Sequence, residues 1–530
     1  LGDEAYAQGV IDAGVSGCYA YPGTPSTEIM EYFQKSAEAA ERGIHREWSC
    51  NEKVAMEVGA GAAFAGGRAI VTMKHVGLNV AADPLFTLTY TGCTGGLVIV
   101  TADDPGMASS QNEQDNRNYA KFAQLPMLEP SDSQEAYDFA IKAFEISEKF
   151  SQPVLFRMTT RVCHSRAIVN LWKEPEQAQP MNFVPNVKER VMVPANARPS
   201  HVRLVKKMQS IALWNEADNG LNRIDGNSAA EIGVITSGIS YQHLLETGAD
   251  VKILKLGMTW PLPAKVIQDF AATVKTVRVV EEGSRFLEEN VRLLGVNVLP
   301  KAEIFEYGEL SASRVEKLLA DDSTPEPDGA PGRPPALCPG CPHRKTFELL
   351  RDLGCIVFGD IGCYTLGVLP PFKAMHYSLC MGASIGMALG ARRVFPEDEA
   401  KKVVSVIGDS TFMHSGITGI VEMVYHRPAN GHLVFILDNS TTAMTGLQEH
   451  AATGRSMEGQ AAPQVKLEEL CRNLGVTNVD VVDPVTAGPA YAELVKSRLE
   501  SNDVSVIIVR RSCLLEMKKL AKLAKGAVKQ

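Results

Sequence analysis

The sequence lacks the features that mark membrane-bound or nucleic-acid-binding proteins. No apolar run approaches the ~20 residues that a helix needs to cross a bilayer, and no signal peptide is visible. No block of lysine and arginine stands out, and the formal net charge is −9. We therefore expect neither a membrane nor nucleic acid as a partner, and a cytoplasmic location. Because the chain begins at Leu1 rather than Met, we also expect residues before it.

Cysteine is too sparse for a secreted disulfide scaffold, with eleven in 530 residues. Apolar residues make up 45% and charged residues 22%, as in ordinary globular proteins. Short β-runs alternate with helical segments, which predicts an α/β protein of three doubly wound domains. We expect domains over 1–185, 229–320 and 336–530, an irregular connector over 186–228 and a proline-rich linker over 321–335.

Two apolar runs of the third domain predict neighbouring parallel strands with polar ends. Val403–Ile407 leads into Gly-Asp-Ser at 408–410, and Leu433–Leu437 leads into Asp-Asn at 438–439. Ligands of open α/β sheets bind at such carboxyl ends, and one carboxylate with one amide oxygen suits Mg²⁺ on a diphosphate. The alternative is that Asp409 caps a helix and that Asn439 lies in a turn.

This pair of strand ends resembles the diphosphate-binding motif of thiamine-diphosphate enzymes, in which Gly-Asp-Gly or Gly-Asp-Ser precedes an Asn by a similar interval. Here 28 residues, 411–438, separate the triplet from the Asn. The resemblance implies thiamine diphosphate with Mg²⁺ held by Asp409, Asn439 and the Thr441 carbonyl, and phosphates lined by Gly408, Ser410 and Ser440.

The first domain carries four candidate catalytic residues. Glu52 begins a helix of small residues; a helix-start Glu is also favoured by the macrodipole alone. The loop 21–28 holds two prolines and several hydroxyls, including Thr24, and its alternative role is to cap the next helix. His75 follows a predicted strand and suits proton transfer near pH 7, or is a buried, hydrogen-bonded histidine. Arg117 ends a polar loop and could grip a carboxylate, or lies in a solvated loop.

Four cysteines of the third domain lie at strand ends or loops. Cys338 and Cys341 form a C-x₂-C pair, Cys363 follows a predicted strand, and Cys513 follows the last one, 504–509. Four thiolates suit a [4Fe–4S] cluster or zinc. The alternative is that Cys363 or Cys513 is a small buried hydrophobic residue. We assign the remaining cysteines to packing: Cys18, Cys50, Cys93, Cys163, Cys355, Cys380 and Cys471.

The whole chain resembles the thiamine-diphosphate-dependent 2-oxoacid:ferredoxin oxidoreductase family, as the large subunit of its indolepyruvate type. The resemblance rests on residues 47–85, CPGCPHR at 338–344, GDIGCYTLG at 359–367 and LDNSTTAMTG at 437–446. It implies two thiamine-binding domains and a transketolase-C-terminal-like domain between them. It also implies that Glu52 activates the cofactor at N1′ of its aminopyrimidine, that Thr24 faces the substrate carboxylate, that Ile361, Gly362 and Cys363 lie beside the cofactor, and that Cys338, Cys341, Cys363 and Cys513 hold a [4Fe–4S] cluster.

The implied reaction is the oxidative decarboxylation of an aryl 2-oxoacid to an acyl-coenzyme A, with electrons passed to ferredoxin or another acceptor. The family implies a smaller beta subunit and a dimer of heterodimers. One departure is large, because the family's ferredoxin-like C-terminal domain, with its two C-x₂-C-x₂-C-x₃-C-P runs, has no match here. The alternatives are a non-oxidative 2-oxoacid decarboxylase, which would not need four cysteines, and a non-catalytic subunit, against which the intact Glu52, Asp409 and Asn439 argue.

Overall fold

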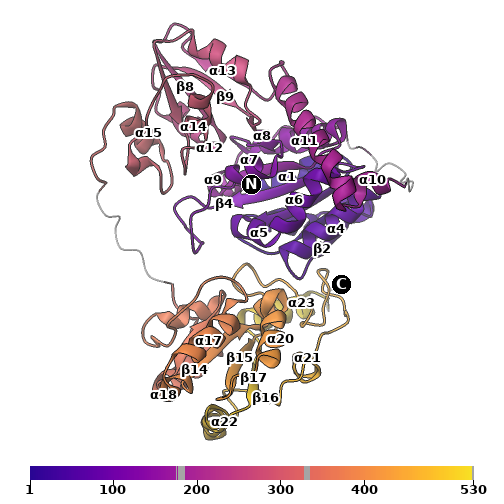
Figure 1. Ribbon diagram of the computed structural model, residues 1–530, viewed down its shortest axis with the longest axis vertical. Helices are drawn as coiled ribbons and strands as arrows, with labels where there is room; N and C mark the ends of the chain where they lie inside the picture. The colour runs from indigo at the N-terminus through magenta and orange to yellow at the C-terminus, as the bar shows by residue number, and fades with distance from the viewer. Residues whose placement is uncertain (175, 177–184, 327–334, 528–530) are drawn as a thin grey trace. The chain divides into compact units, whose positions relative to one another are not determined.

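The chain folds into two compact units, Leu1–Asp328 and Gly329–Gln530 (Figure 1). The computed structural model describes residues 1–174, 176, 185–326 and 335–527. The predicted linker, 321–335, falls largely on 327–334, outside the described residues. No helix within the described ranges is both long and apolar enough to span a membrane.

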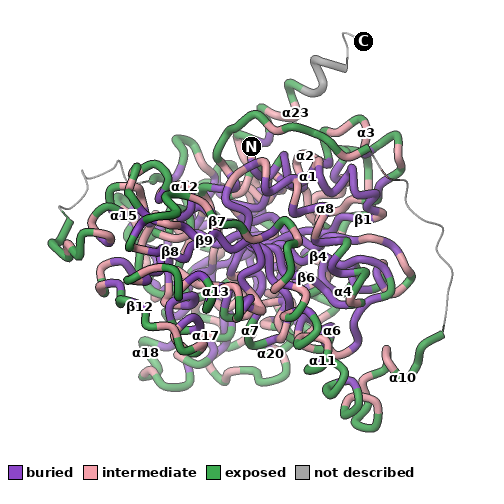
Figure 2. Tube along the Cα trace, turned by 90° about the horizontal axis from the view of Figure 1, so that it is seen from above, coloured by how far each residue is buried: buried purple, intermediate pink, exposed green. Residues whose placement is uncertain are grey.

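The first unit begins with a seven-stranded sheet of order β10-β5-β6-β4-β3-β1-β2. All neighbours are parallel except β10, which runs antiparallel to β5. Every residue of β3, β4 and β6 is buried, as expected of parallel strands covered on both faces (Figure 2). The strands are β1 (Gly17–Ala20), β2 (His45–Trp48), β3 (Ala69–Lys74), β4 (Leu97–Asp103), β5 (Met127–Leu128), β6 (Val154–Thr159) and β10 (Met258–Trp260).

Nine helices accompany this sheet among the described residues. Residue Gly9 of the first helix lies so close to the eighth that a Cβ there would be 2.5 Å from the Tyr137 carbonyl oxygen. Gly59 likewise brings the fourth helix within van der Waals contact of Val71 in β3. The helices are α1 (Gly2–Asp12), α2 (Thr27–Lys35), α3 (Ala37–Glu41), α4 (Glu52–Phe64), α5 (His75–Val80), α6 (Ala82–Thr91), α7 (Arg117–Ala123), α8 (Ser133–Phe150) and α9 (Thr160–His164).

The segment predicted as an irregular connector is largely regular. It contains α10 (Val187–Arg190), the 22-residue α11 (Pro194–Asn215) and strand β7 (Arg223–Gly226). The prediction of irregular structure was wrong because α11 buries little: Ser200, Leu204, Ile211 and Asn215 are its only buried residues. Because most of its residues are polar and exposed, the sequence of this helix lacks the clear apolar stripe by which an amphipathic helix is predicted.

The second sheet of the first unit has the order β12-β11-β8-β9-β7, with only β7 antiparallel. One hydrophobic cluster joins this domain to the first, because Leu254 and Leu256 belong to the same core as Leu125 and Met127. The elements are β8 (Ile232–Ser237), β9 (Lys252–Leu256), β11 (Thr276–Val280), β12 (Val298–Leu299), α12 (Gly238–Glu246), α13 (Ala264–Ala271), α14 (Phe286–Leu293), the 3₁₀ helix η1 (Glu303–Phe305) and α15 (Ala312–Leu319).

The second unit has a five-stranded parallel sheet of order β13-β14-β15-β17-β16. Its strands are β13 (Ile356–Gly359), β14 (Val403–Gly408), β15 (His432–Asp438), β16 (Asn478–Val482) and β17 (Val504–Arg510). Its helices are α16 (His343–Asp352), η2 (Cys363–Val368), α17 (Ala383–Val394), α18 (Glu397–Ala400), α19 (Asp409–Thr411), the π-helical η3 (Phe412–Gly416), α20 (Ile417–Tyr425), α21 (Leu467–Asn473), α22 (Pro489–Glu500) and α23 (Leu514–Ala527).

Candidate active site

Three predicted residues of the first unit lie at one edge of its sheet. Thr24 is in the loop after β1, His75 directly follows β3, and Arg117 begins α7 after the loop that leaves β4. Strands β4, β3 and β1 are parallel neighbours, so their carboxyl ends meet at the same edge. This is the edge where an open α/β sheet binds ligands.

Glu52 is a buried residue in the first turn of α4. The Asn51 side chain caps this helix by accepting a hydrogen bond from the Val54 N–H (2.9 Å). The Glu52 carboxylate lies against α5 at Gly77, where a Cβ would be 2.6 Å from its Oε1 and 2.7 Å from its Cγ. Gly77 therefore provides the space that this carboxylate occupies, a role that we did not predict from the sequence.

His75 is fully buried, and only one of its ring nitrogens has a hydrogen-bond partner within the described structure. Nε2 lies 3.0 Å from Asn112 Oδ1, whereas Nδ1 has none. Because buried polar atoms are normally paired, Nδ1 is a position where a ligand or water would bond. Both interpretations of His75, as a group for proton transfer and as a buried, hydrogen-bonded histidine, therefore stay predictions.

Lys74 is the last residue of β3, and we predicted no role for it from the sequence. Its stem packs against the loop of Thr24, since a Cβ on Gly23 would lie 2.8 Å from the Lys74 Cβ. Its ammonium donates a hydrogen bond to the Ser109 carbonyl (2.8 Å). Burial lowers the pKa of Lys74 to about 8. The signal in the sequence was a lysine at the end of an otherwise apolar strand.

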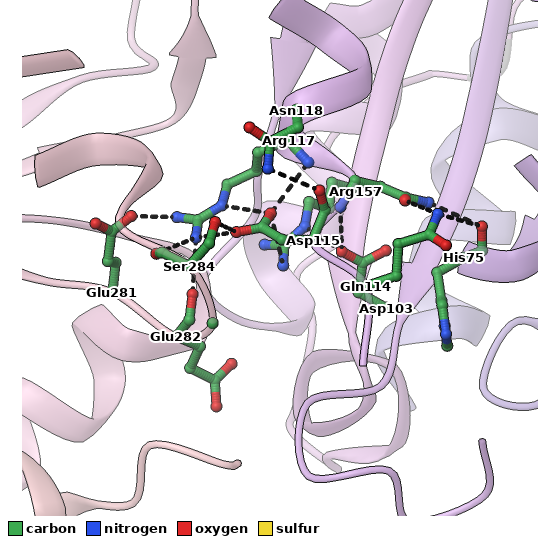
Figure 3. A network of polar contacts seen from close by, with 12 residues as sticks. His75, Asp103, Gln114, Asp115, Arg117, Asn118, Arg157, Glu281, Glu282 and Ser284 are labelled. Carbon is green, nitrogen blue, oxygen red and sulfur yellow. Dashed lines mark hydrogen bonds and ion pairs between the residues drawn. The ribbon is translucent and has the colours of Figure 1, made fainter. Parts of the chain in front are cut away.

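Arg117 is 1% exposed, so its interpretation as part of a solvated loop was wrong. Its guanidinium donates to Asp115 (2.6 Å), to Glu281 (2.6 Å) and to the Glu282 carbonyl (2.7 Å). Figure 3 shows these bonds reaching from the first domain to the second. With its three nitrogens bonded to protein oxygens, Arg117 joins the two domains, and we withdraw the carboxylate-gripping role predicted for it.

A second buried arginine extends this network toward His75 (Figure 3). Arg157 pairs with Asp103 (2.7 Å), whose carboxylate also accepts the Asn116 N–H (2.9 Å). The Asn116 amide donates to the His75 carbonyl (3.1 Å). Although burial raises the pKa of Asp115, Arg117 and Arg157 together hold it well below its usual range. The loop after β4 is thus fixed by buried charges.

In the second unit, β14 and β15 bring Asp409 and Asn439 side by side. The register pairs Gly408 with Leu437, so both polar residues lie just beyond the paired ends. The Ser440 N–H donates to Asp409 Oδ2 (2.8 Å) and the Thr441 N–H to Asn439 Oδ1 (3.1 Å). Asp409 also accepts the Ser410 N–H (3.0 Å). The predicted phosphate-lining and metal-binding residues therefore form one cluster, which we call the strand-end cluster (residues 408–410 and 439–441).

The segment after β13, which contains Ile361 and Gly362, packs on this cluster. A Cβ on Gly408 would lie 2.5 Å from Cε1 of Tyr364, and one on Gly362 would lie 2.4 Å from the same atom. The Tyr364 hydroxyl donates to the Ile361 carbonyl (2.9 Å). Only glycines allow the ring to lie between these two backbones.

Three further polar residues of this region received no predicted role, although Asp360 and His343 lie inside the motifs at 359–367 and 338–344. Asp360 is fully buried and accepts the backbone N–H groups of residues 382 (2.7 Å) and 384 (3.1 Å). His450 lies 3.3 Å from Asp409 Oδ2. His343 lies 3.3 Å from the Asn439 amide, and burial lowers its pKa to about 4. The imidazoles of His343 and His450 thus lie beside the strand-end cluster.

The structure brings the four predicted cluster cysteines together. Burial, then the thiols of Cys341, Cys513 and Cys338, raise the pKa of Cys363 to about 11. The Cys513 N–H donates to the Asn439 carbonyl (2.9 Å), which joins the thiols to the strand-end cluster. Cys363 and Cys513 are partly exposed, so neither is a buried hydrophobic residue. Of the cysteines assigned to packing, Cys50 and Cys380 are exposed and do not pack.

Two family models match the two parts of the chain that contain these residues. The family model for "Thiamine pyrophosphate enzyme, C-terminal TPP binding domain" matches residues 360–509, and that for "Pyruvate flavodoxin/ferredoxin oxidoreductase, thiamine diP-bdg" matches residues 8–224. The indolepyruvate oxidoreductase subunit IorA of Methanothermobacter thermautotrophicus is 41% identical, over 97% of this chain and 86% of that protein. Those of Archaeoglobus fulgidus and Pyrococcus horikoshii are each 39% identical over 97% of this chain and over 86% and 85% of theirs.

The chain belongs to the IorA family. The resemblance to thiamine-dependent 2-oxoacid:ferredoxin oxidoreductases is therefore confirmed. Thiamine diphosphate is the family's cofactor; Glu52 lies in the matched region 8–224, and the strand-end cluster lies in the matched region 360–509. Neither compact unit of this IorA-family chain carries both groups of residues.

Proposed function

We propose that this chain oxidatively decarboxylates an aryl 2-oxoacid such as indolepyruvate, forms an acyl-coenzyme A, and passes the electrons through a [4Fe–4S] cluster to ferredoxin or an equivalent acceptor. The observation that carries the proposal is the hydrogen bond from Cys513 to the Asn439 carbonyl. It joins a group of four thiols to the residues that would bind the diphosphate. A non-oxidative decarboxylase has no use for such a group.

The strand-end cluster fits a diphosphate with Mg²⁺. The Asp409 carboxylate, the Asn439 amide oxygen and the Thr441 carbonyl oxygen are the hard oxygen ligands that Mg²⁺ prefers beside phosphates. Gly408 leads into the site with the Tyr364 ring where its Cβ would lie, and Ser410 and Ser440 add hydroxyl groups. Ser440 has a φ of +63°, a conformation that non-glycine residues rarely adopt outside functional sites.

Bound thiamine diphosphate supplies the electron sink that decarboxylation of a 2-oxoacid needs. Glu52, held against Gly77, would keep a proton at N1′ of the aminopyrimidine. His75 would bond through its unpaired Nδ1 and assist proton transfer. The Thr24 hydroxyl would orient the substrate carboxylate, with the Lys74 ammonium beside it as a positive charge.

The four thiols fit an iron–sulfur cluster better than a zinc ion. No three of the four sulfurs lie within 4.8 Å of one another, whereas Zn–S bonds of about 2.3 Å would hold tetrahedral ligands about 3.8 Å apart. A four-iron cluster spaces its thiolates more widely than one ion does. We infer that Cys338, Cys341, Cys363 and Cys513 bind the cluster, that a smaller beta subunit completes the enzyme, and that two such pairs form a dimer of heterodimers.

The test uses the complex purified anaerobically with its partner subunit. Indolepyruvate with coenzyme A should reduce a viologen dye, and the as-isolated protein should contain about four irons per chain with a [4Fe–4S] EPR signal after reduction. Glu52→Gln should lower turnover by about 10²- to 10⁴-fold with the iron content unchanged. Glu57→Gln, at an exposed position of the same helix, is the matched control. Release of an aldehyde without dye reduction would instead establish the non-oxidative reaction.

A further inference from the structure

Three potential metal ligands converge in the first domain, outside the site described above. Asp3 comes from α1, Glu28 from the first turn of α2, and His164 from the end of α9. One ligand atom from each lies within 4.8 Å of the other two. Glu28 Oε2 and His164 Nε2 are 3.5 Å apart. We call these residues the three-helix triad.

Backbone packing fixes the geometry of the triad. The N–H of Gly2 donates to the carbonyl of Ser165 (3.2 Å), immediately after His164. A Cβ on Gly2 would lie 1.9 Å from the Val162 carbonyl oxygen, so only glycine lets α1 begin this close to α9. The positions of Asp3 and His164 are thus set by the main chain rather than by flexible side chains.

The environment of the Asp3 carboxylate indicates that a ligand binds there. Its side chain is fully buried, and neither carboxylate oxygen has a hydrogen-bond partner in the described structure. No lysine or arginine in the described ranges forms a salt bridge with Asp3 or Glu28. Burying a carboxylate in this state is costly unless a proton or a cation compensates it.

We propose that the three-helix triad binds a divalent transition-metal ion, with Zn²⁺ as the best match. Two carboxylates balance the charge of the ion, and an imidazole selects a transition metal over Mg²⁺ or Ca²⁺. His164 also lines a cavity of about 390 Å³, together with Thr160 and Ser165. The cavity reaches the triad at His164, where the ion would enter.

The ion would tie together three helices around the loop that carries Thr24. Glu28 follows Thr24 by four residues, so metal bound at Glu28 anchors the end of this loop on α1 and α9. Metal bound only to the folded state stabilises that state by mass action. The triad would therefore stabilise the first domain.

The experiment compares zinc content in the intact enzyme. Wild type, Asp3→Asn, His164→Ala and the control His45→Ala are dialysed against a chelator with excess Mg²⁺, then against micromolar Zn²⁺, and analysed by mass spectrometry. His45 is an exposed histidine 3.0 Å from Glu47 and lacks a third ligand. Wild type and control should bind one more zinc per chain than the two triad variants. Zinc should raise their melting temperature by several degrees and leave that of the variants unchanged.

Asp3→Asn also distinguishes a bound metal from a bound proton as the group that compensates Asp3, because asparagine has the shape of the protonated acid. If Asp3 only holds a proton, this variant will bind as much zinc as wild type and melt at the same temperature, which would overturn the proposal. Should Asp3→Asn fail to fold, the partly exposed His164 decides instead. Equal zinc content in His164→Ala and wild type would likewise overturn it.

Discussion

The position of the candidate catalytic residue Glu52 depends on its neighbour Gly77. In Gly77→Ala the new Cβ would lie 2.6 Å from Glu52 Oε1, so the carboxylate must move away from its present position. We expect turnover to fall at least tenfold with little change in melting temperature. Gly61→Ala is the control, because a Cβ at that position of α4 meets nothing within 4 Å. Steady-state kinetics of both variants would test this, and equal activity would contradict the placement of Glu52.

Lys74 should make substrate binding depend on pH. Its pKa of about 8 means that the ammonium is charged below this pH and neutral above it. Since a 2-oxoacid is anionic, its KM should rise as the pH increases through 8. Lys74→Met should show a raised KM, by about tenfold, without this inflection. Lys74→Arg should keep the low KM to higher pH, because arginine stays charged. A KM profile from pH 7 to 9.5 that is unchanged in Lys74→Met would exclude the role.

Buried strands were predicted more accurately from the sequence than exposed elements. The strands β14, β15 and β17 were predicted to within a few residues, because strands buried on both faces are continuous apolar runs. Helix α11 was missed because it is mostly exposed. The three-residue β10 was missed because its pairing with β5 depends on distant chain.

Some residues of the candidate site could be proposed from the sequence, and others only from the folded structure. Residues in compact motifs, such as Asp409 or Cys341, were found because their local sequence is distinctive. Lys74, Gly77 and His343 acquire their roles only through contacts made by folding. Local sequence cannot report such contacts, and this limit explains why Arg117 was assigned to the substrate rather than to a buried ion pair.

Strand β15 contains a buried histidine that should make the second unit sensitive to acid. Burial, then the Arg392 charge, lowers the pKa of His432 to about 3. Its folded-state pKa lies below the ordinary value of about 6.5, so stability is complete above pH 6.5 and is lost as the pH falls toward 3. The loss is about 1.4 kcal/mol per pH unit, or about 2 kcal/mol by pH 5.

Urea unfolding at pH 8 and pH 5 would measure this loss. In His432→Gln the side chain stays neutral, so the difference between the two pH values should shrink by about 2 kcal/mol. His426→Gln, which replaces a half-exposed histidine after α20, should leave the difference unchanged. An identical pH dependence in wild type and His432→Gln would refute the assignment.

At the scale of the whole molecule, the first two domains behave as one body. They share a hydrophobic core, β10 extends the first sheet, and Arg117 bonds Glu281 across the boundary. The loop that precedes Arg117 contains Asn112 and Asn116, which contact His75. The second domain therefore supports the candidate active site through this loop.

Arg117→Met tests this coupling. The substitution leaves Glu281 buried without its ion-pair partner and Asp115 with Arg157 alone, which should cost about 3–5 kcal/mol. The exposed pair of Arg161 and Glu309 crosses the same boundary, and Arg161→Met should cost no more than about 1 kcal/mol. Urea unfolding of the first unit's transition would compare the two variants. If both variants lost similar stability, the buried pair would hold the domains no better than a surface contact. If the prediction holds, adding Glu281→Gln to Arg117→Met should recover part of the lost stability, because the unpaired charge of Glu281 is then removed.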